Sequence, residues 1–172
     1  MQYRADRSAL LSRRTRSTPM GAIYEVMSHQ IDVSIAEIID GDLLAAIAQF
    51  IPQLSSSAAV PDVEQLREIL ACPCTTLLLA RNAERRIVGM LTLVTFRIPT
   101  GVRARIEDVV VDSQSRSAGV GQALTGKALE IALSRRARTV DLTSDPKRGA
   151  ASRLYQKLGF KLRETNVYRY SP

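Results

Sequence analysis

The stretch that decides the fold is Arg105–Gln122, which reads RIEDVVVDSQSRSAGVGQ. Its first half is a strand-like apolar run, and its second half is a loop of small residues that opens a helix. Backbone N–H groups at a helix N-terminus bind phosphate oxygens, and Gly119 and Gly121 allow close approach because they lack side chains. The stretch therefore predicts a cradle for a phosphorylated cofactor, with the carboxylates of Glu107 and Asp108 a few residues upstream.

The composition indicates a single globular domain. The chain has 172 residues, enough for one domain to bury roughly two thirds of its unfolded surface. Its apolar fraction is 45% and its charged fraction is 24%, and no apolar run approaches the ~18 residues of a membrane helix. We expect a cytoplasmic protein, monomeric or homodimeric, that does not bind a membrane.

The cysteines and the histidine argue against several enzyme classes. Cys72 and Cys74 are separated by one residue, too close and too few for a disulfide framework or a four-ligand metal site. We interpret them as free thiols of a reducing cytosol. His29 is the only histidine in the sequence and lies near a segment predicted to be flexible. Hydrolases with a Ser-His-Asp triad and metalloenzymes are therefore not favoured, and no metal cofactor is expected.

The distribution of charge argues against a nucleic-acid partner. The formal net charge is +7, but the first 26 residues carry five arginines and two acidic residues, which leaves +4 for the remainder. Aromatic residues make up 5% of the chain and tryptophan is absent, so few side chains could stack on bases. We predict a flexible basic N-terminal extension over residues 1–26 and one domain over residues 27–172.

Hydrophobic periodicity predicts strands and helices on both sides of the deciding stretch. Short turns join three consecutive strands, which therefore form an antiparallel meander, and the fold class is mixed α/β (α+β). The expected elements in chain order are a strand over 31–36, a helix from Asp40 that stops at Pro52, a helix from Pro61 that closes at Pro73, strands over 75–81, 87–96 and 102–112, a helix that follows Gly119 and ends in Arg135, Arg136 and Arg138, a strand over 139–143, a helix over 149–158, and a terminal strand or hairpin over 160–170.

A dinucleotide-binding fingerprint is the competing explanation of the two glycines. That fingerprint is G-x-G-x-x-G with an acidic residue about twenty positions later, and Asp141 lies at this distance from Gly121. However, Leu124 occupies the position of the third glycine, and about seven residues separate the preceding strand from Gly119. The preceding strands are also joined by hairpins instead of crossover helices. These features oppose the dinucleotide interpretation.

Two motifs together resemble the GNAT superfamily of acyl-CoA N-acyltransferases. The pyrophosphate loop of this family has the form R/Q-x-x-G-x-G/A, which Arg116–Gly121 matches. A second family element, A-x-x-L-Y-x-x-x-G-F, is matched by Ala151–Phe160. The resemblance covers residues 31–170. It implies the GNAT fold, a mostly antiparallel mixed sheet of six to seven strands flanked by about four helices.

The resemblance implies acetyl-CoA as the cosubstrate. Backbone N–H groups of the loop would surround the CoA pyrophosphate, and the main chain of Val109–Val111 would pair with the pantetheine arm like an added strand. Ser152 stands where family members often have an asparagine that touches the pantetheine. The cofactor-binding residues implied by the resemblance are Val109, Val110, Val111, Arg116, Ser117, Ala118, Gly119, Val120, Gly121, Gln122, Ser152 and Tyr155.

The resemblance also implies direct transfer of an acetyl group to a primary amine in a ternary complex. An alkylamine with a pKa near ~10.4 is mostly protonated at neutral pH, so a carboxylate should accept its proton directly or through water. Glu107 is the first candidate for this base and Asp108 the second; a regular strand would point them to opposite faces unless a bulge re-aims one of them. A backbone N–H near Val110 could stabilise the oxyanion. Tyr155 resembles the general acid of the family, which protonates the departing thiolate.

Two other functions stay open at this point. One is a CoA-binding regulatory or interaction module without turnover, although the presence of Glu107 and Tyr155 argues against it. The other is a nucleic-acid binder that uses the basic segment 1–26. The segment Ile106–Val111 is similar to a strand of glucosamine-phosphate acetyltransferases within the family. It is too short to identify the acceptor, which leaves amino sugars, amino acids, polyamines and protein amines open.

Overall fold

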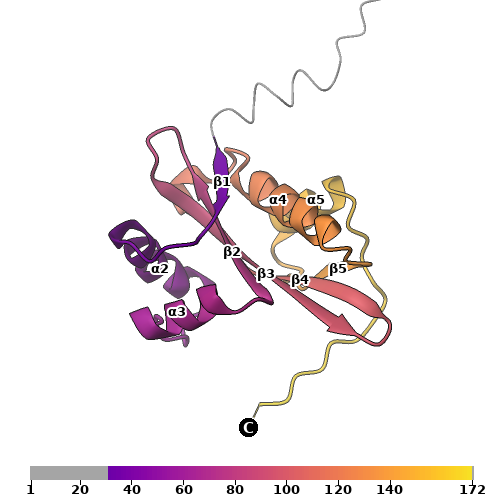
Figure 1. Ribbon diagram of the computed structural model, residues 1–172. Helices are drawn as coiled ribbons and strands as arrows, with labels where there is room; N and C mark the ends of the chain where they lie inside the picture. Colours follow the sequence, from indigo (N-terminus) through magenta and orange to yellow (C-terminus); the bar gives the residue numbers. More distant parts are fainter. Residues whose placement is uncertain (1–30, 172) are drawn as a thin grey trace, which may run out of the picture.

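A five-stranded sheet organises the computed structural model, which describes residues 31–171 (Figure 1). The strand order is β1-β2-β3-β4-β5. Strands β1 to β4 pair antiparallel, β2 to β4 form the predicted meander, and β5 pairs parallel with β4. The predicted basic extension over residues 1–26 lies outside the described residues. The strands are β1 (Asp32–Ile35), β2 (Thr75–Arg81), β3 (Ile87–Ile98), β4 (Gly101–Val111) and β5 (Val140–Leu142).

Helices cover both faces of this sheet, so the core has two layers. Helices α2 and α3 lie on one face, and α4 lies on the other with α5 beside it (Figure 1). Leu91, Leu93 and Ile106 are buried beneath α4, whereas Met90 and Val110 are buried with α2 and α3. The helices are α2 (Gly41–Leu54), α3 (Val63–Ala71), α4 (Val120–Ser134) and α5 (Gly149–Lys157), and a short 3-10 turn, η1 (Ser113–Ser115), follows β4.

Two aspartates begin α2 and α3 as the sequence predicts. Asp40 Oδ1 accepts a hydrogen bond from Leu43 N at 2.8 Å. Asp62 and Gln65 form a reciprocal capping box at the start of α3. The prediction that Pro52 stops α2 is wrong, because the helix continues to Leu54. Pro52 leaves the carbonyl of Ala48 without its intrahelical donor, and Ala48 is exposed, so water can bond that carbonyl.

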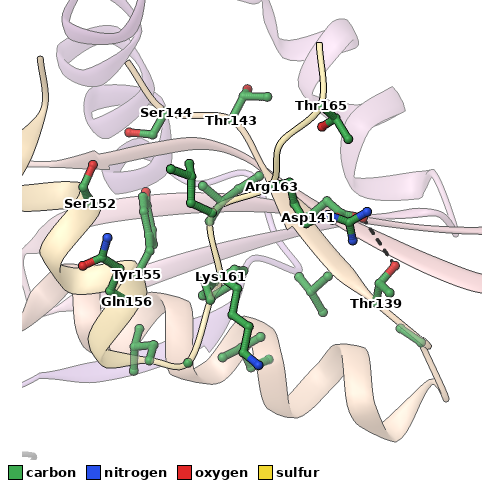
Figure 2. Close-up of a pocket in the computed structure, with 18 of the residues that line it drawn as sticks. Thr139, Asp141, Thr143, Ser144, Ser152, Tyr155, Gln156, Lys161, Arg163 and Thr165 are labelled. Atoms are coloured by element: carbon green, nitrogen blue, oxygen red, sulfur yellow. Dashed lines mark hydrogen bonds between the residues drawn. The ribbon is translucent and has the colours of Figure 1, made fainter. Parts of the chain in front are cut away.

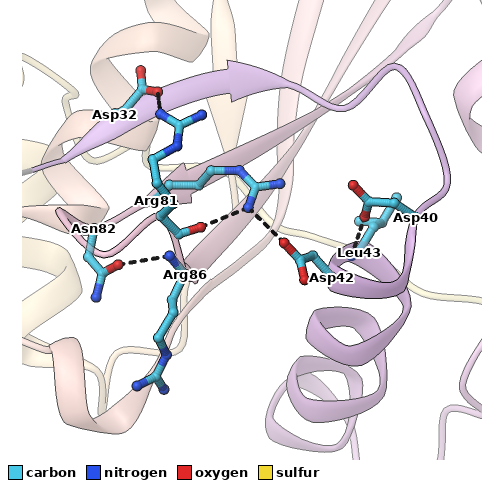
Figure 3. Close-up of polar contacts among 8 residues, drawn as sticks. Asp32, Asp40, Asp42, Leu43, Arg81, Asn82 and Arg86 are labelled. Atoms are coloured by element: carbon cyan, nitrogen blue, oxygen red, sulfur yellow. Dashed lines mark hydrogen bonds and ion pairs between the residues drawn. The ribbon is translucent and has the colours of Figure 1, made fainter.

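Arg81 joins the β2–β3 turn to the start of α2 (Figure 3). Its Nη1 donates to the Arg85 carbonyl at 2.9 Å and lies 3.5 Å from Asp42 Oδ2. Asn82 Oδ1 accepts from Arg86 N at 2.9 Å, which closes the turn. These contacts confirm the predicted hairpin and connect it to the helix that covers the same end of the sheet.

The terminal strand or hairpin predicted over residues 160–170 is not formed, so the sheet has five strands instead of six or seven. Residues 160–171 adopt neither helix nor strand. Leu162 is 92% exposed and Tyr168 is 88% exposed, so the alternating pattern of this segment buries no face. A strand needs a partner edge as well as a pattern, and the neighbouring β5 spans only three residues.

Candidate active site

Asp108 marks an irregularity in β4. Met90 pairs with Val110 but Thr92 pairs with Glu107, so β4 holds one more residue than β3 between these two pairs. Asp108 adopts a left-handed conformation with φ of 52°. This arrangement is a β-bulge, which locally re-aims side chains and is common next to active sites. The simple alternation expected for Glu107 and Asp108 therefore ends at the bulge.

Next to this bulge, the edge of β4 that faces β5 is no longer paired with another strand in residues 31–171. The parallel pairing of the two strands ends at Ile106 and Leu142. Within the described residues, no strand pairs with Glu107–Val111 on that side. An extended ligand chain can add to an open strand edge through main-chain hydrogen bonds. The opening therefore suits the contact predicted for the main chain of Val109–Val111.

The loop after β4, which we name the cradle loop, has a backbone shape that fits an anion. Ser117 and Gly119 both have positive φ, 68° and 81°, and the chain turns through them into α4. In the part of the chain that the structure describes, the N–H groups of these two residues donate to no protein acceptor. Helix geometry also leaves the first N–H groups of α4 without intrahelical acceptors. A Cβ added at Gly119 would meet no atom within 4 Å. The residues thus fit a ligand that carries phosphate groups.

Gly121 brings α4 close to α5 and to the end of β4. A Cβ added at Gly121 would lie 3.2 Å from Leu154 Cδ2 and 3.8 Å from Val111 Cγ2. Lys157 Nζ on α5 also donates to Gln122 Oε1 at 3.4 Å. The G-x-G spacing therefore has two different causes. Gly119 provides the left-handed turn, and Gly121 provides the close contact between helices.

Asp112 connects β4, the cradle loop and α2. Its side chain is 5% exposed, and it accepts hydrogen bonds from Gln114 N and from Gln49 Nε2, both at 2.9 Å. The backbone amide of Gln114 is the main cause that lowers the pKa of Asp112, and the Gln49 side chain acts in the same direction. Sequence reasoning missed Gln49, because it lies 63 positions before its partner and no local pattern relates the two.

Tyr155 and Ser152 on α5 line a cavity of about 810 Å³ (Figure 2). The cavity lies between α5, the residues Thr143 and Ser144 that follow β5, and residues 161–167. Burial raises the pKa of the Tyr155 phenol, and the charge of Arg148 opposes this shift in part. The Tyr155 ring packs edge-on against Phe160 with a centroid separation of 5.8 Å. At neutral pH the phenol is therefore protonated and held in place, as a proton donor must be.

The fold agrees with the comparison with protein families. The acetyltransferase (GNAT) family matches residues 44–160. The chain belongs to this GNAT family. A comparison with curated proteins gave no match.

Solved structures share the fold of this GNAT protein over nearly their full length. A transcriptional regulator from Bacillus halodurans C-125 is 29% identical with a TM-score of 0.66, over 81% of this chain and 100% of that chain. An acetyltransferase from Trypanosoma brucei is 25% identical with a TM-score of 0.67, over 82% of this chain and 99% of that one. AAC(6′)-Iy, solved with a bisubstrate analog that contains CoA, is 17% identical with a TM-score of 0.66, over 83% and 98%; it shows the fold alone.

The predicted site residues of this GNAT protein form two groups. The loop, the end of β4 and α5 meet around Gly121, which places most of the predicted cofactor-binding residues together. Tyr155 and Ser152 line the cavity, whereas Glu107 and Asp108 do not. Glu107 Oε1 instead forms an ion pair with Arg105 Nε. Burial, and secondly the charge of Glu107, raises the pKa of Asp108.

Residues 31–171 contain neither a metal-binding cluster nor a membrane-spanning helix. This part of the chain holds no group of three or more His, Cys, Asp or Glu residues that could bind a metal ion. None of its helices has the length and apolar character needed to cross a membrane.

Proposed function

We propose that this GNAT protein is an acetyl-CoA-dependent N-acetyltransferase that transfers an acetyl group directly to a primary amine of a small molecule or a protein. The observation that carries the proposal is the cradle loop, whose left-handed Ser117 and Gly119 open α4 beside the unpaired side of β4. Acetyl-CoA, when bound, supplies an acyl group activated as a thioester. We further propose a cytoplasmic location, which the free thiols of Cys72 and Cys74 support.

The donor would be held by main-chain groups. N–H groups of Arg116–Gly121 would donate hydrogen bonds to the phosphate oxygens, and the N-terminus of α4 would add its favourable dipole. The main chain of Val109–Val111 would hold an extended arm along the open side of β4. Ser152 would donate or accept a hydrogen bond from α5. This set consists mainly of backbone groups, so it orients the ligand without a dedicated cation.

The chemistry would be divided between β4 and α5. Glu107, or alternatively Asp108, would take the proton of the incoming ammonium, because only the free amine is nucleophilic. The backbone N–H near Val110 would face the charge that develops on the carbonyl oxygen. Tyr155 would return a proton to the leaving thiolate. The raised pKa of Tyr155 supports this role, because the phenol then keeps its proton up to alkaline pH.

Two measurements on the purified full chain test the proposal. Isothermal titration calorimetry with CoA checks the cradle, and thiol release from acetyl-CoA with a broad amine panel checks turnover. We expect micromolar or tighter CoA binding and acetylation of at least one amine. CoA binding without acetylation of any amine would instead favour a regulatory CoA-binding module. Absence of CoA binding would contradict the assignment of the loop.

A further inference from the structure

One side of the β3–β4 hairpin is left open beside Glu107. Cross-strand pairing places six residues on this side, which we name the hairpin face. Leu93 and Ile106, on the opposite side of the hairpin, are fully buried beneath α4. The hairpin face continues the surface that α2 and α3 cover at Met90, but its own side chains are half-buried or exposed. Its residues are Thr92, Val94, Phe96, Arg103, Arg105 and Glu107.

The charges of the hairpin face are ordered along β4. Glu107 lies next to the bulge, and Arg105 and Arg103 follow it with increasing distance. Arg105 Nε forms an ion pair with Glu107. Among the described residues, Arg103 has no carboxylate partner, and its Nη2 is 3.3 Å from Thr100 Oγ1. The face therefore presents one anionic group followed by two cationic groups, with Phe96 39% exposed beside them.

The strand provides a ruler for a ligand on this face. Residues of a strand rise about 3.3 Å each, so Arg105 lies about 7 Å and Arg103 about 13 Å from Glu107 along β4. These are spacings of backbone positions: the Arg105 guanidinium itself contacts Glu107, and the Arg103 guanidinium lies beside Thr100. A ligand amine placed at Glu107 would therefore meet the Arg105 guanidinium first and the Arg103 guanidinium farther along β4. Its connecting chain would lie over Val94 and Phe96, which are opposite the arginines on β3.

We infer that the amine acceptor carries an anionic group, a carboxylate or a phosphate, which Arg103 and Arg105 bind while the amine lies at Glu107. This inference rests on the proposed acetyltransferase function. Glu107 and Arg105 form an ion pair with each other in the free protein. In the complex the ligand ammonium would pair with Glu107 and the ligand anion with Arg105, so binding leaves neither charge unpaired. A polyamine, by contrast, places its second ammonium group against two arginines.

The experiment compares three classes of amine of equal length: ω-amino acids, α,ω-diamines and simple alkylamines, with four to ten carbons. Binding to the CoA-bound protein is measured by calorimetry, and kcat/KM is measured by thiol release. We expect 6-aminohexanoate and 8-aminooctanoate to exceed the diamines and alkylamines of the same length by about 10-fold or more. The preference should fall for 4-aminobutanoate, which is too short to reach Arg103.

Two charge reversals on the same hairpin provide the variant and its control. Arg103→Glu should remove the preference for ω-amino acids and favour the diamines, and Arg103→Lys should retain part of the original preference. Arg97→Glu is the control, because Arg97 is exposed and pairs with Val102 on the opposite side of the hairpin. It changes the net charge equally and should leave the preference in place.

The outcomes separate this inference from the proposed function. Equal binding of anionic and cationic amines by the natural chain would overturn the inference, even if both are acetylated. Equal effects of Arg103→Glu and Arg97→Glu would also overturn it. Selective binding of ω-amino acids without acetylation of any amine would support the class of ligand assigned to the hairpin face and reject the acetyltransferase function.

Discussion

Tyr155 is the side chain whose surroundings fit one catalytic role best. Burial raises the pKa of its phenol, Phe160 fixes the ring, and the hydroxyl-bearing face of α5 borders the cavity. A phenol in this state can donate a proton throughout the neutral range. The hydroxyl group can be removed by substitution with phenylalanine, which keeps the ring that packs against Phe160.

Tyr155→Phe should therefore lower kcat for acetyl transfer about 100-fold, because the proposed proton donor is lost while the ring remains. The dissociation constant of CoA should change little. Steady-state kinetics and calorimetry on the same preparation measure both values. Unchanged kcat would remove Tyr155 from the mechanism, and a parallel loss of CoA affinity would indicate a binding role instead.

The two carboxylates of the bulge can be distinguished by isosteric variants. Glu107→Gln should lower kcat about 100-fold, because the amide cannot accept the proton of the amine. Asp108→Asn is the matched comparison. Asparagine tolerates the left-handed φ of 52°, so this variant removes the charge without straining the bulge. A larger loss of kcat in Asp108→Asn would identify Asp108 as the base.

At the scale of elements, α4 joins the cradle to the rest of the site. Its N-terminus follows Gly119, its first turn contacts α5 through Gly121, and its buried face rests on β3 and β4. The cradle therefore depends on how closely α4 and α5 pack. Two glycines of the same helix allow this dependence to be measured.

Gly121→Ala should weaken CoA binding about 10-fold, because the new methyl lies 3.2 Å from Leu154 Cδ2 and separates α4 from α5. Gly126→Ala is the control, since nothing lies within 4 Å of its added Cβ. Alanine has the higher helix propensity, so this control should stabilise the protein by roughly 0.5–1 kcal/mol without changing CoA affinity. Equal CoA affinity in the two variants would refute the proposed role of the helix contact.

At the scale of the whole molecule, Asp112 lies directly after β4 and links α2 to the loop between β4 and α4. Its buried carboxylate receives one hydrogen bond from the loop and one from Gln49. Because the folded protein lowers the pKa of this carboxyl, the ionised form favours the folded state. The link is thus a pH-dependent part of global stability.

The free energy of unfolding should accordingly depend on pH through Asp112. Its contribution is present above the ordinary pKa of 3.8 and is lost as pH falls through the lowered pKa of the folded state. Denaturant titrations between pH 6 and pH 2 should show a steeper loss of stability for the natural chain than for Asp112→Asn. The Asn side chain can still accept from Gln114 N, and Gln49 can reverse its amide to accept from it. Parallel pH curves would contradict this assignment.

Most elements and the two family motifs could be predicted from local sequence. Periodicity and caps are local properties, so α3, β2 and the start of α2 agree closely with expectation. The bulge could not be placed, because it depends on which residues of β3 pair with β4. Neither could the absence of strands in residues 160–170, because local pattern does not report whether a partner edge exists.

The amino-acid order alone determined the small-residue loop between β4 and α4, the position of Tyr155 after it, and hence the donor that the family resemblance implies. These features depend on backbone freedom and short-range spacing. Tertiary structure alone decided the left-handed Asp108, the contact of Gln49 with Asp112, and the lack, among the described residues, of a covering helix over the face that Arg103, Arg105 and Glu107 share. Such features depend on strand register and on pairs of residues distant in the chain, and these are set by packing of the whole sheet.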